Sequence, residues 1–185
     1  MNGVAVALIF QRFFRGDDGG TLNSIIALFG ADPVKWLSNG AINNWCLVFA
    51  SVWRYIGFDI LMFIGAIQSI SPDIYEAADL DGANAWQKFW HIIFPGIRTI
   101  IALQLILAIK GAASVFEIPY IITGGKMGTS TFVIKTIETG FQYQKIGLAS
   151  AMAIVLLFII IVITMIQKIF FLSLIHISEP TRLRC

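Results

Sequence analysis

Charged residues are scarce in this chain. Asp, Glu, Lys and Arg make up 13% of its 185 residues, whereas 57% are hydrophobic and the mean hydropathy is +0.80. A soluble domain of this length does not need that much hydrocarbon to build its core. The formal net charge is only +2 and no basic run is present, so nucleic acid is not an expected partner. The composition therefore indicates an integral membrane protein.

Residues that build metal sites and catalytic centres are equally few. Cys46 and Cys185 lie far apart in different contexts, which indicates neither a disulfide framework nor a metal site. His91 is the one histidine outside the C-terminal tail, and no HExxH motif or Ser/His/Asp arrangement is present. The glycine-rich segment 124–130 contains a lysine but lacks the spacing of a phosphate-binding loop. We therefore expect no catalytic residue, no cofactor and no metal in this chain.

The sequence contains three long apolar runs. They extend from about Trp45 to Ile70, from about Thr99 to Ile121 and from about Gly147 to Phe171. Each reaches the roughly 20 apolar residues that cross a bilayer, and only a helix satisfies its own backbone in lipid. The run Val4–Phe10 is too short to cross and has no signal-peptide flanks, so we expect the end of a partial helix. The expected fold is an all-α membrane protein with three full transmembrane helices and a partial one.

The expected organisation follows from these runs. Residues 1–11 form the partial helix, 12–44 an extramembrane segment with a short interfacial helix at IIALFG, and 45–171 the transmembrane domain. The loop 124–145 is expected to share one side of the membrane with 12–44, because the runs alternate. Residues 172–185 contain LSLIHISEPTR, which looks like the translation of a transposon adapter used in sequencing libraries. We expect this segment to be a non-native tail without functional residues.

The segment 71–98 between the first two runs has the signals of a bent helical hairpin. Ser71 can cap a helix, and Pro72 suits the first helical position. Asp81-Gly82 is expected to break this helix, because glycine permits the backbone angles of a tight bend. The sequence therefore predicts a first short helix that ends at this dipeptide.

A second short helix is expected to resume near Asn84 and to end at Pro95. Its large apolar side chains recur at helical spacing and form one face, made of Trp86, Phe89, Trp90 and Ile93. On these residues alone, an interfacial loop anchored at the lipid headgroups by its tryptophans also explains the segment.

The string EAADLDGANAWQKFWHIIFP, residues 76–95, resembles the EAA loop of bacterial ABC importer permeases. The EAA start, the DGA turn, the aromatic-rich helix, the aliphatic stretch and the proline occur in the family's order and spacing. Downstream, AIKGAASVFEIPYIITGG and GFQYQKIGLASAMAIVL are similar to the following helix, loop and last helix of carbohydrate-type permeases. The similarity covers most of residues 40–171. Lys126 departs from the pattern, which commonly has proline after Thr-Gly-Gly.

The resemblance implies a type I ABC importer permease core with a cytoplasmic coupling-helix pair, located as a multi-pass protein in the bacterial cytoplasmic membrane. The implied activity is import of a sugar or related polar solute, with ATP hydrolysis in partner chains. The implied partners are a second permease subunit, two ATP-binding ATPase subunits, an extracytoplasmic solute-binding protein and membrane lipid. The residues expected to couple to the ATPases are Glu76, Ala77, Ala78, Asp81, Gly82, Trp86, Phe89, Trp90 and Pro95.

Polar residues within the expected spans are candidates for the substrate pathway, because an unpaired charge in the bilayer costs at least a few kcal/mol. The candidates are Arg54, Asp59, Gln104, Lys110, Ser114 and Glu117. A structural role is the alternative, with Arg54 and Glu117 near membrane ends and Lys110 paired with Asp59. The same charges leave open a secondary transporter or channel subunit that uses them for ion coupling and needs no ATPase.

Orientation is the point at which the charge rule and the resemblance disagree. Basic residues are more numerous in 12–44 and 124–145 than in 71–98 and the C-terminal part, so the positive-inside rule places the hairpin outside. The resemblance places it in the cytoplasm. We adopt the cytoplasmic placement, because helices that precede the partial one normally dominate the charge count.

Overall fold

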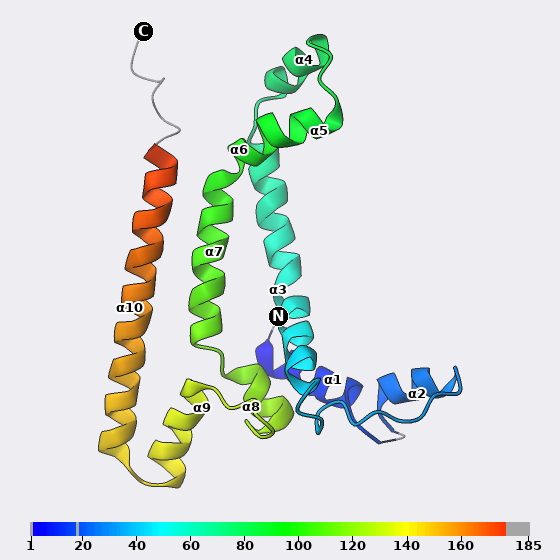
Figure 1. Cartoon of the computed structure of the whole chain (residues 1–185), viewed down its shortest axis with the longest axis vertical. Helices are drawn as coiled ribbons and strands as arrows, with labels where there is room; N and C mark the ends of the chain where they lie inside the picture. Colours follow the sequence, from blue (N-terminus) through cyan, green and yellow to red (C-terminus); the bar gives the residue numbers. More distant parts are fainter. Residues whose placement is uncertain (1, 18, 177–185) are drawn as a thin grey trace. The chain divides into compact units, whose positions relative to one another are not determined.

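The computed structural model describes residues 2–17 and 19–176, and this part of the chain is helical without a β-strand. The helices are α1 Gly3–Phe13, α2 Thr21–Ala27, α3 Asn43–Gln68, α4 Pro72–Leu80, α5 Ala85–Lys88, α6 Phe94–Gly96, α7 Arg98–Ala113, α8 Glu117–Thr123, α9 Phe132–Ile137 and α10 Ile146–His176 (Figure 1). Two π-helical turns, Phe89–Ile93 and Glu138–Gln142, follow α5 and α9. The expected all-α class is confirmed.

Two helices within the described residues are long and apolar enough to cross a membrane. They are α3, with 26 residues, and the Ile146–Ile169 part of α10, with 24 residues. The third candidate is a bent pair, Ala85–Gly96 with Arg98–Ala113, whose two parts meet at 63°. The expected second span, Thr99–Ile121, is therefore wrong at its end, because the chain leaves the helix after Ala113. It re-enters a separate helix, α8, at Glu117.

Pro119 accounts for the new helix start. Proline lacks a backbone N–H and is tolerated in the first turn of a helix, where that donor has no partner. Pro119 is the third residue of α8. In the middle of a continuous helix the same ring clashes with the preceding turn. The apolar run continues through this point, but the helix does not.

The chain forms two compact units. Unit 1 contains residues up to Ile56 together with Ala112–Ile159, and unit 2 contains Gly57–Gly111 together with the described remainder of α10. Because α3 passes from one unit into the other, its first half belongs to the core of unit 1. Its second half belongs with the hairpin that follows it.

The core of unit 1 is built by α1, the first half of α3 and α8. Its buried side chains are Val6, Ala7, Phe10, Phe14, Cys46, Leu47, Ala50, Ile118 and Ile122. The ring of Phe10 lies 5.8 Å from that of Phe49 and 5.4 Å from that of Trp53, both edge to face. Gln11 Nε2 donates to the carbonyl of Ile121 at 2.7 Å, which ties α1 to the end of α8.

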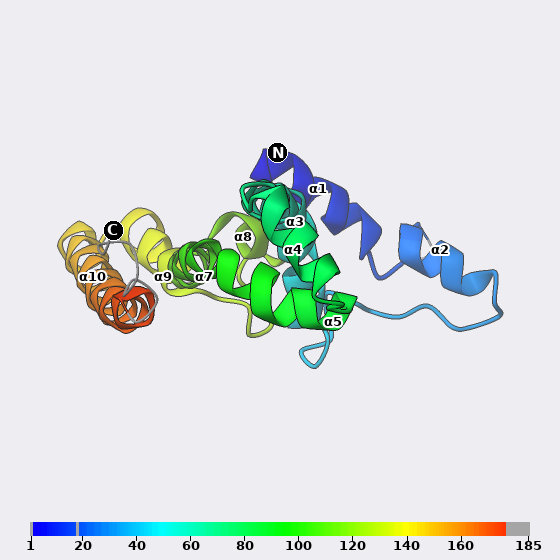
Figure 2. The same ribbon diagram turned by 90° about the horizontal axis from the view of Figure 1, so that it is seen from above.

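The helix α2 lies in the loop between α1 and α3. It overlaps the short helix expected at IIALFG only over residues 25–27 and begins four residues earlier. Buried Asn23 organises this loop. Its Nδ2 donates to Val34 O at 3.1 Å, and its Oδ1 accepts from Val34 N at 3.1 Å and from Trp36 Nε1 at 2.8 Å. The side chain of Asn23 therefore connects α2 to the segment that contains Val34 and Trp36. The helix α2 projects away from α1 (Figure 2).

The C-terminal part of α10 continues through residues 172–176. The remainder of the expected non-native tail, from residue 177 to residue 185, lies outside the described residues. The functional boundaries at residues 11, 44 and 171 stay predictions.

Candidate coupling hairpin and charged residues of the spans

The first half of the hairpin is α4. Ser71 occupies its N-cap position and Pro72 its first helical position, as expected. The Ser71 hydroxyl, however, donates to Asp73 Oδ2 at 3.2 Å and accepts no backbone N–H. Pro72 has no backbone N–H, so one of the amide donors that lack a partner at a helix N-terminus is absent here. The proline therefore contributes more to the start of α4 than the serine side chain does.

The bend after α4 is a Schellman turn. Gly82 has φ of 74°, a left-handed conformation that costs a residue with a Cβ atom about 1–2 kcal/mol. Ala83 N donates to Ala78 O at 2.9 Å, and Gly82 N donates to Asp79 O at 3.1 Å. These are the two hydrogen bonds that define the motif. The predicted break at Asp81-Gly82 is confirmed.

The second half starts with a capping box that the sequence analysis missed. Gln87 N donates to Asn84 Oδ1 at 2.9 Å, and Asn84 N donates to Gln87 Oε1 at 2.8 Å. The spacing of an N-cap residue followed by Gln three positions later was the available signal. This reciprocal pair sets the start of α5 at Ala85 without help from the rest of the fold.

The three aromatic residues of the face predicted for the second half lie together, while the place of Ile93 on this face stays a prediction. Ring centroids lie 6.1 Å apart for Trp86 and Phe89, 5.7 Å for Trp86 and Trp90, and 5.2 Å for Phe89 and Trp90. The cluster continues to Phe94, whose ring lies 5.2 Å from that of Trp90. Trp86 is 69% exposed, so the cluster leaves a large apolar surface for lipid or protein.

The helix ends at Gly96, one residue beyond the expected end at Pro95. Pro95 lies inside α6, and the helical path is interrupted at Ile97, with φ of −95° and ψ of 3°. Beside it, Gly96 gives the chain room to pass the end of α3, because a Cβ atom there meets Ile70 Cδ1 at 2.7 Å. The bend before α7 therefore depends on close packing as well as on proline.

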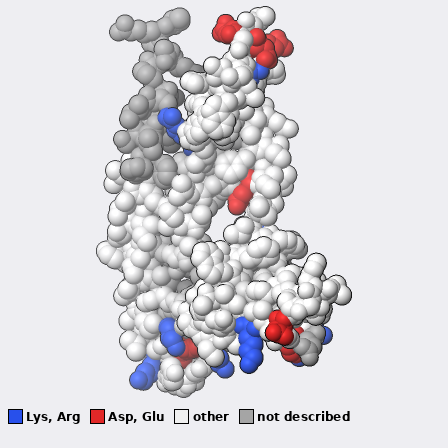
Figure 3. Space-filling view, turned by 45° about the vertical axis from the view of Figure 1, so that its right-hand side comes forward, with Lys and Arg blue, Asp and Glu red and all other residues white. Residues whose placement is uncertain are grey.

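An ion pair joins the two halves of the hairpin. Lys88 Nζ binds Asp79 Oδ1, across the turn. Acidic side chains otherwise dominate this end of unit 2, where Figure 3 shows them gathered at the surface. They come from α4 and the turn and are Asp73, Glu76, Asp79 and Asp81.

The two halves enclose a cleft of about 340 Å³. Three of the residues expected to couple to a partner line it, namely Ala78, Asp81 and Gly82. Glu76 and Ala77 are exposed on α4. Leu80 is 90% exposed at the tip, and sequence reasoning did not single it out because its apolar character fits a helix core equally well.

Arg54, expected in the first span, and Glu117, expected in the second, form an ion pair inside unit 1. Arg54 Nη1 lies 2.7 Å from Glu117 Oε2, which joins α3 to the start of α8. The guanidinium also lies over the ring of Tyr55, 5.0 Å from its centroid. Gly3 of α1 passes directly over the pair, since a Cβ atom there falls 1.8 Å from Glu117 Oε2 and 2.4 Å from Arg54 Nη1. Three helices therefore meet at this contact.

The polar residues of unit 2 form a second contact. Gln104 Nε2 donates to Asp59 Oδ1 at 3.0 Å and links α7 to the second half of α3. Lys110 lies in the last turn of α7, and Ser114 follows the helix. Within residues 2–17 and 19–176, no three His, Cys, Asp or Glu side chains are placed to hold a metal ion.

Comparisons with known proteins agree on one family. Residues 3–175 match the family described as "Binding-protein-dependent transport system inner membrane component". The osmoprotective compounds uptake permease protein GgtC of Synechocystis sp. is 36% identical over 142 residues, which make up 77% of this chain and 51% of that protein. The arabinooligosaccharides transport system permease protein AraP of Bacillus subtilis is 32% identical over 168 residues, 89% of this chain and 53% of that protein.

Solved structures give the same result. The chain is similar to one in the crystal structure of a bacterial ABC transporter involved in the import of the acidic polysaccharide alginate, with a TM-score of 0.86 and 25% identity. The match covers 94% of this chain and 61% of that chain. A second structure of a bacterial alginate ABC transporter, in complex with an alginate pentasaccharide-bound periplasmic protein, gives a TM-score of 0.82. The chain thus spans about half the length of the two sequence relatives.

Proposed function

Because this chain belongs to the family of binding-protein-dependent transport system inner membrane components, we propose that it is the transmembrane permease subunit of an ATP-binding cassette importer. In this role it pairs with a second permease subunit and two ATPase subunits. An extracytoplasmic solute-binding protein delivers the cargo. The family match and the EAA-type hairpin, with its capped halves and glycine turn, carry the proposal.

The proposed cargo is a sugar, an oligosaccharide or a related polar solute. Relatives that match this chain are named for osmoprotective compounds, arabinooligosaccharides and trehalose/maltose. Each polar side chain in the spans carries at least one hydrogen-bond donor or acceptor. Recognition of a hydroxyl-rich cargo requires such groups. Among them, our candidates for the pathway remain Asp59, Gln104, Lys110 and Ser114. The pairing of Arg54 with Glu117 favours a structural role for those two.

The hairpin is the proposed docking site for an ATPase subunit. The Asp79–Lys88 ion pair and the Schellman hydrogen bonds at Gly82 join its two halves. A displacement of one half by the ATPase therefore displaces the other half as well. Its acidic surface favours a partner with a basic face, because complementary charge speeds and orients docking. Leu80 and the aromatic cluster of Trp86, Phe89 and Trp90 supply apolar anchors, which is the kind of side chain that dominates interfaces.

The proposed orientation places the hairpin in the cytoplasm and the loop that carries Met127 outside. Both tips offer an exposed apolar residue, Leu80 at 90% and Met127 at 60%, which makes them a matched pair for labelling. In a background with Cys46 and Cys185 replaced by serine, we expect a membrane-impermeant maleimide to label Met127→Cys in sealed cells and Leu80→Cys only after lysis. Labelling of Leu80→Cys in sealed cells contradicts the proposed orientation and the ATPase docking with it.

ATPase docking itself is tested by crosslinking. We expect Leu80→Cys to form a crosslinked product with an ATPase subunit encoded beside this chain and expressed with it. Met127→Cys serves as the control and forms none. Cargo uptake that continues in vesicles depleted of ATP, and stops when an ionophore collapses the ion gradients, overturns the importer proposal in favour of ion-coupled transport.

A further inference from the structure

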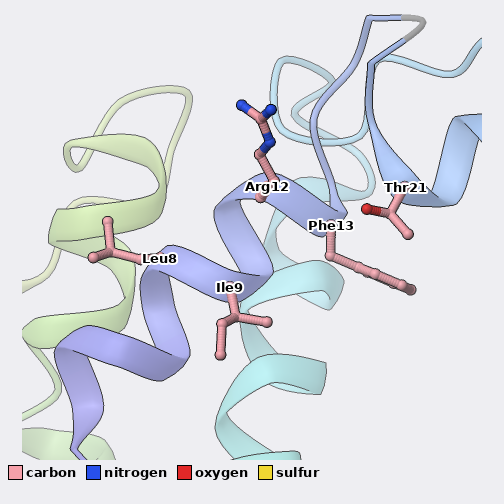
Figure 4. Close-up of a pocket in the computed structure, with 5 residues that line it drawn as sticks. All are labelled: Leu8, Ile9, Arg12, Phe13 and Thr21. Carbon is pink, nitrogen blue, oxygen red and sulfur yellow. The ribbon is translucent and has the colours of Figure 1, made fainter.

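A hollow of about 590 Å³ lies between α1 and the start of α2 (Figure 4). Leu8, Ile9, Arg12 and Phe13 line it from α1, and Thr21 lines it from α2. Its volume falls within the roughly 300–1,000 Å³ typical of small-molecule sites. The whole hollow lies within unit 1, so its geometry does not depend on the second unit.

The lining of the hollow is apolar except for Arg12 and Thr21. Leu8 and Ile9 are 53% and 56% exposed, although Val6 and Ala7 on the other face of α1 are fully buried. The helix therefore has an inner face in the core of unit 1 and an outer apolar face that the described residues leave uncovered. In a membrane protein, such a face is solvated by acyl chains.

Arg12 adds a charge to this face. It lies four residues, about 6 Å, beyond Leu8 along α1. In Figure 4 its guanidinium extends to the side opposite Ile9. No ion pair or hydrogen bond joins it to another described residue, whereas the guanidinium of nearby Arg15 binds Asp17 at 2.6 Å. Within the described residues its five donors have no partner, and their planar arrangement matches a phosphate.

We propose that this hollow binds an anionic phospholipid of the surrounding bilayer. Its phosphate lies on Arg12, with the Thr21 hydroxyl as a second donor, and an acyl chain lies over Leu8, Ile9 and Phe13. A phospholipid presents an anionic phosphate one short glycerol unit away from hydrocarbon, and the hollow likewise has a cation beside apolar side chains. A sugar fits poorly, because three of the five lining residues offer only hydrocarbon.

The proposal is tested by native mass spectrometry of the purified full chain in detergent. Dioleoyl phosphatidylglycerol and dioleoyl phosphatidylcholine are titrated separately. We expect one phosphatidylglycerol to bind each chain about tenfold more tightly than phosphatidylcholine, because charge-assisted hydrogen bonds are the stronger ones. Arg12→Gln removes this preference, and Arg12→Lys keeps part of it because lysine lacks the planar fork.

Lys126→Gln is the matched control, since Lys126 is an exposed cation of the same unit outside the hollow. It is expected to bind both lipids as the unmodified chain does. Equal binding of phosphatidylglycerol to Arg12→Gln and to the unmodified chain overturns the site. Displacement of the lipid by glycerol phosphate at the lipid's own concentration overturns the acyl contact, and shows that the ligand is a soluble phosphate ester.

Discussion

Arg54 and Glu117 are separated by 63 residues in the sequence, yet Nη1 of the first lies 2.7 Å from Oε2 of the second. Each anchors a different helix, and Gly3 of a third helix lies against both. The pair removes two unpaired charges from the apolar part of unit 1. It also fixes where α8 begins relative to α3, so we regard it as a structural contact of unit 1 rather than as a cargo site.

Replacing one partner of this pair is expected to destabilise unit 1, because the other charge stays behind in an apolar setting. We expect Arg54→Gln and Glu117→Gln each to lower the midpoint of thermal unfolding in detergent. The double variant is expected to lose less than the sum, with a coupling of about 1 kcal/mol. Unfolding followed by circular dichroism measures this cycle. Additive losses indicate that the two side chains do not interact.

Gly3 is predicted to be intolerant of any side chain. A Cβ atom at this position overlaps Glu117 Oε2 at 1.8 Å, so Gly3→Ala must displace the carboxylate or shift α1. Gly147→Ala is the control, because open space surrounds that position. We expect Gly3→Ala to lower the unfolding midpoint and Gly147→Ala to leave it unchanged or raise it. In the Glu117→Ala background the cost of Gly3→Ala should shrink.

Gly82 is predicted to be replaceable only by residues that accept the left-handed region. Space is not the obstacle, since nothing lies within 4 Å of a Cβ atom there. We expect Gly82→Val to reduce ATP-dependent uptake strongly, because valine resists a φ of 74° and opens the Schellman turn. Gly82→Asn is expected to retain most of the activity. Equal uptake by the two variants contradicts the dependence of coupling on the turn.

Asn23 is predicted to hold the loop between α1 and α3 in one conformation. Asn23→Ala removes both hydrogen bonds to Val34 and the one from Trp36. We expect faster amide hydrogen exchange in residues 20–36, and unchanged exchange in α10. Asn39→Ala is the control, because Asn39 Oδ1 accepts only from Ala41 N nearby. Unchanged exchange in Asn23→Ala shows that the loop is held by its apolar contacts instead.

The hairpin was largely predictable because its signals are local. Pro72, Gly82 and the Asn84–Gln87 box each act within a few residues of themselves, so the sequence around them decides the conformation. The apolar runs likewise identified α3 and α10. These features do not depend on which part of the chain packs nearby.

Contacts between distant segments could not be predicted in the same way. The pairing of Arg54 with Glu117 and the close passage of Gly3 depend on how three helices meet. Gln104 Nε2 donates to the carboxylate of Asp59, a contact that no signal near either residue indicates. The end of α7 was missed for another reason. Hydropathy continues through Pro119, and the helix-start signal of that proline was given too little weight.

The early end of α7 also has a consequence for hydration. Its 16 residues make a rod of about 24 Å, shorter than the roughly 30 Å hydrocarbon layer. Beyond Ala113 the peptide groups of residues 114–116 leave the regular helical ladder, and Val115 N reaches Ala112 O only at 3.5 Å. Lipid tails offer such groups no substitute donors or acceptors. Any peptide group of residues 114–116 that lies within the hydrocarbon layer therefore needs a hydrogen-bond partner from water or from polypeptide.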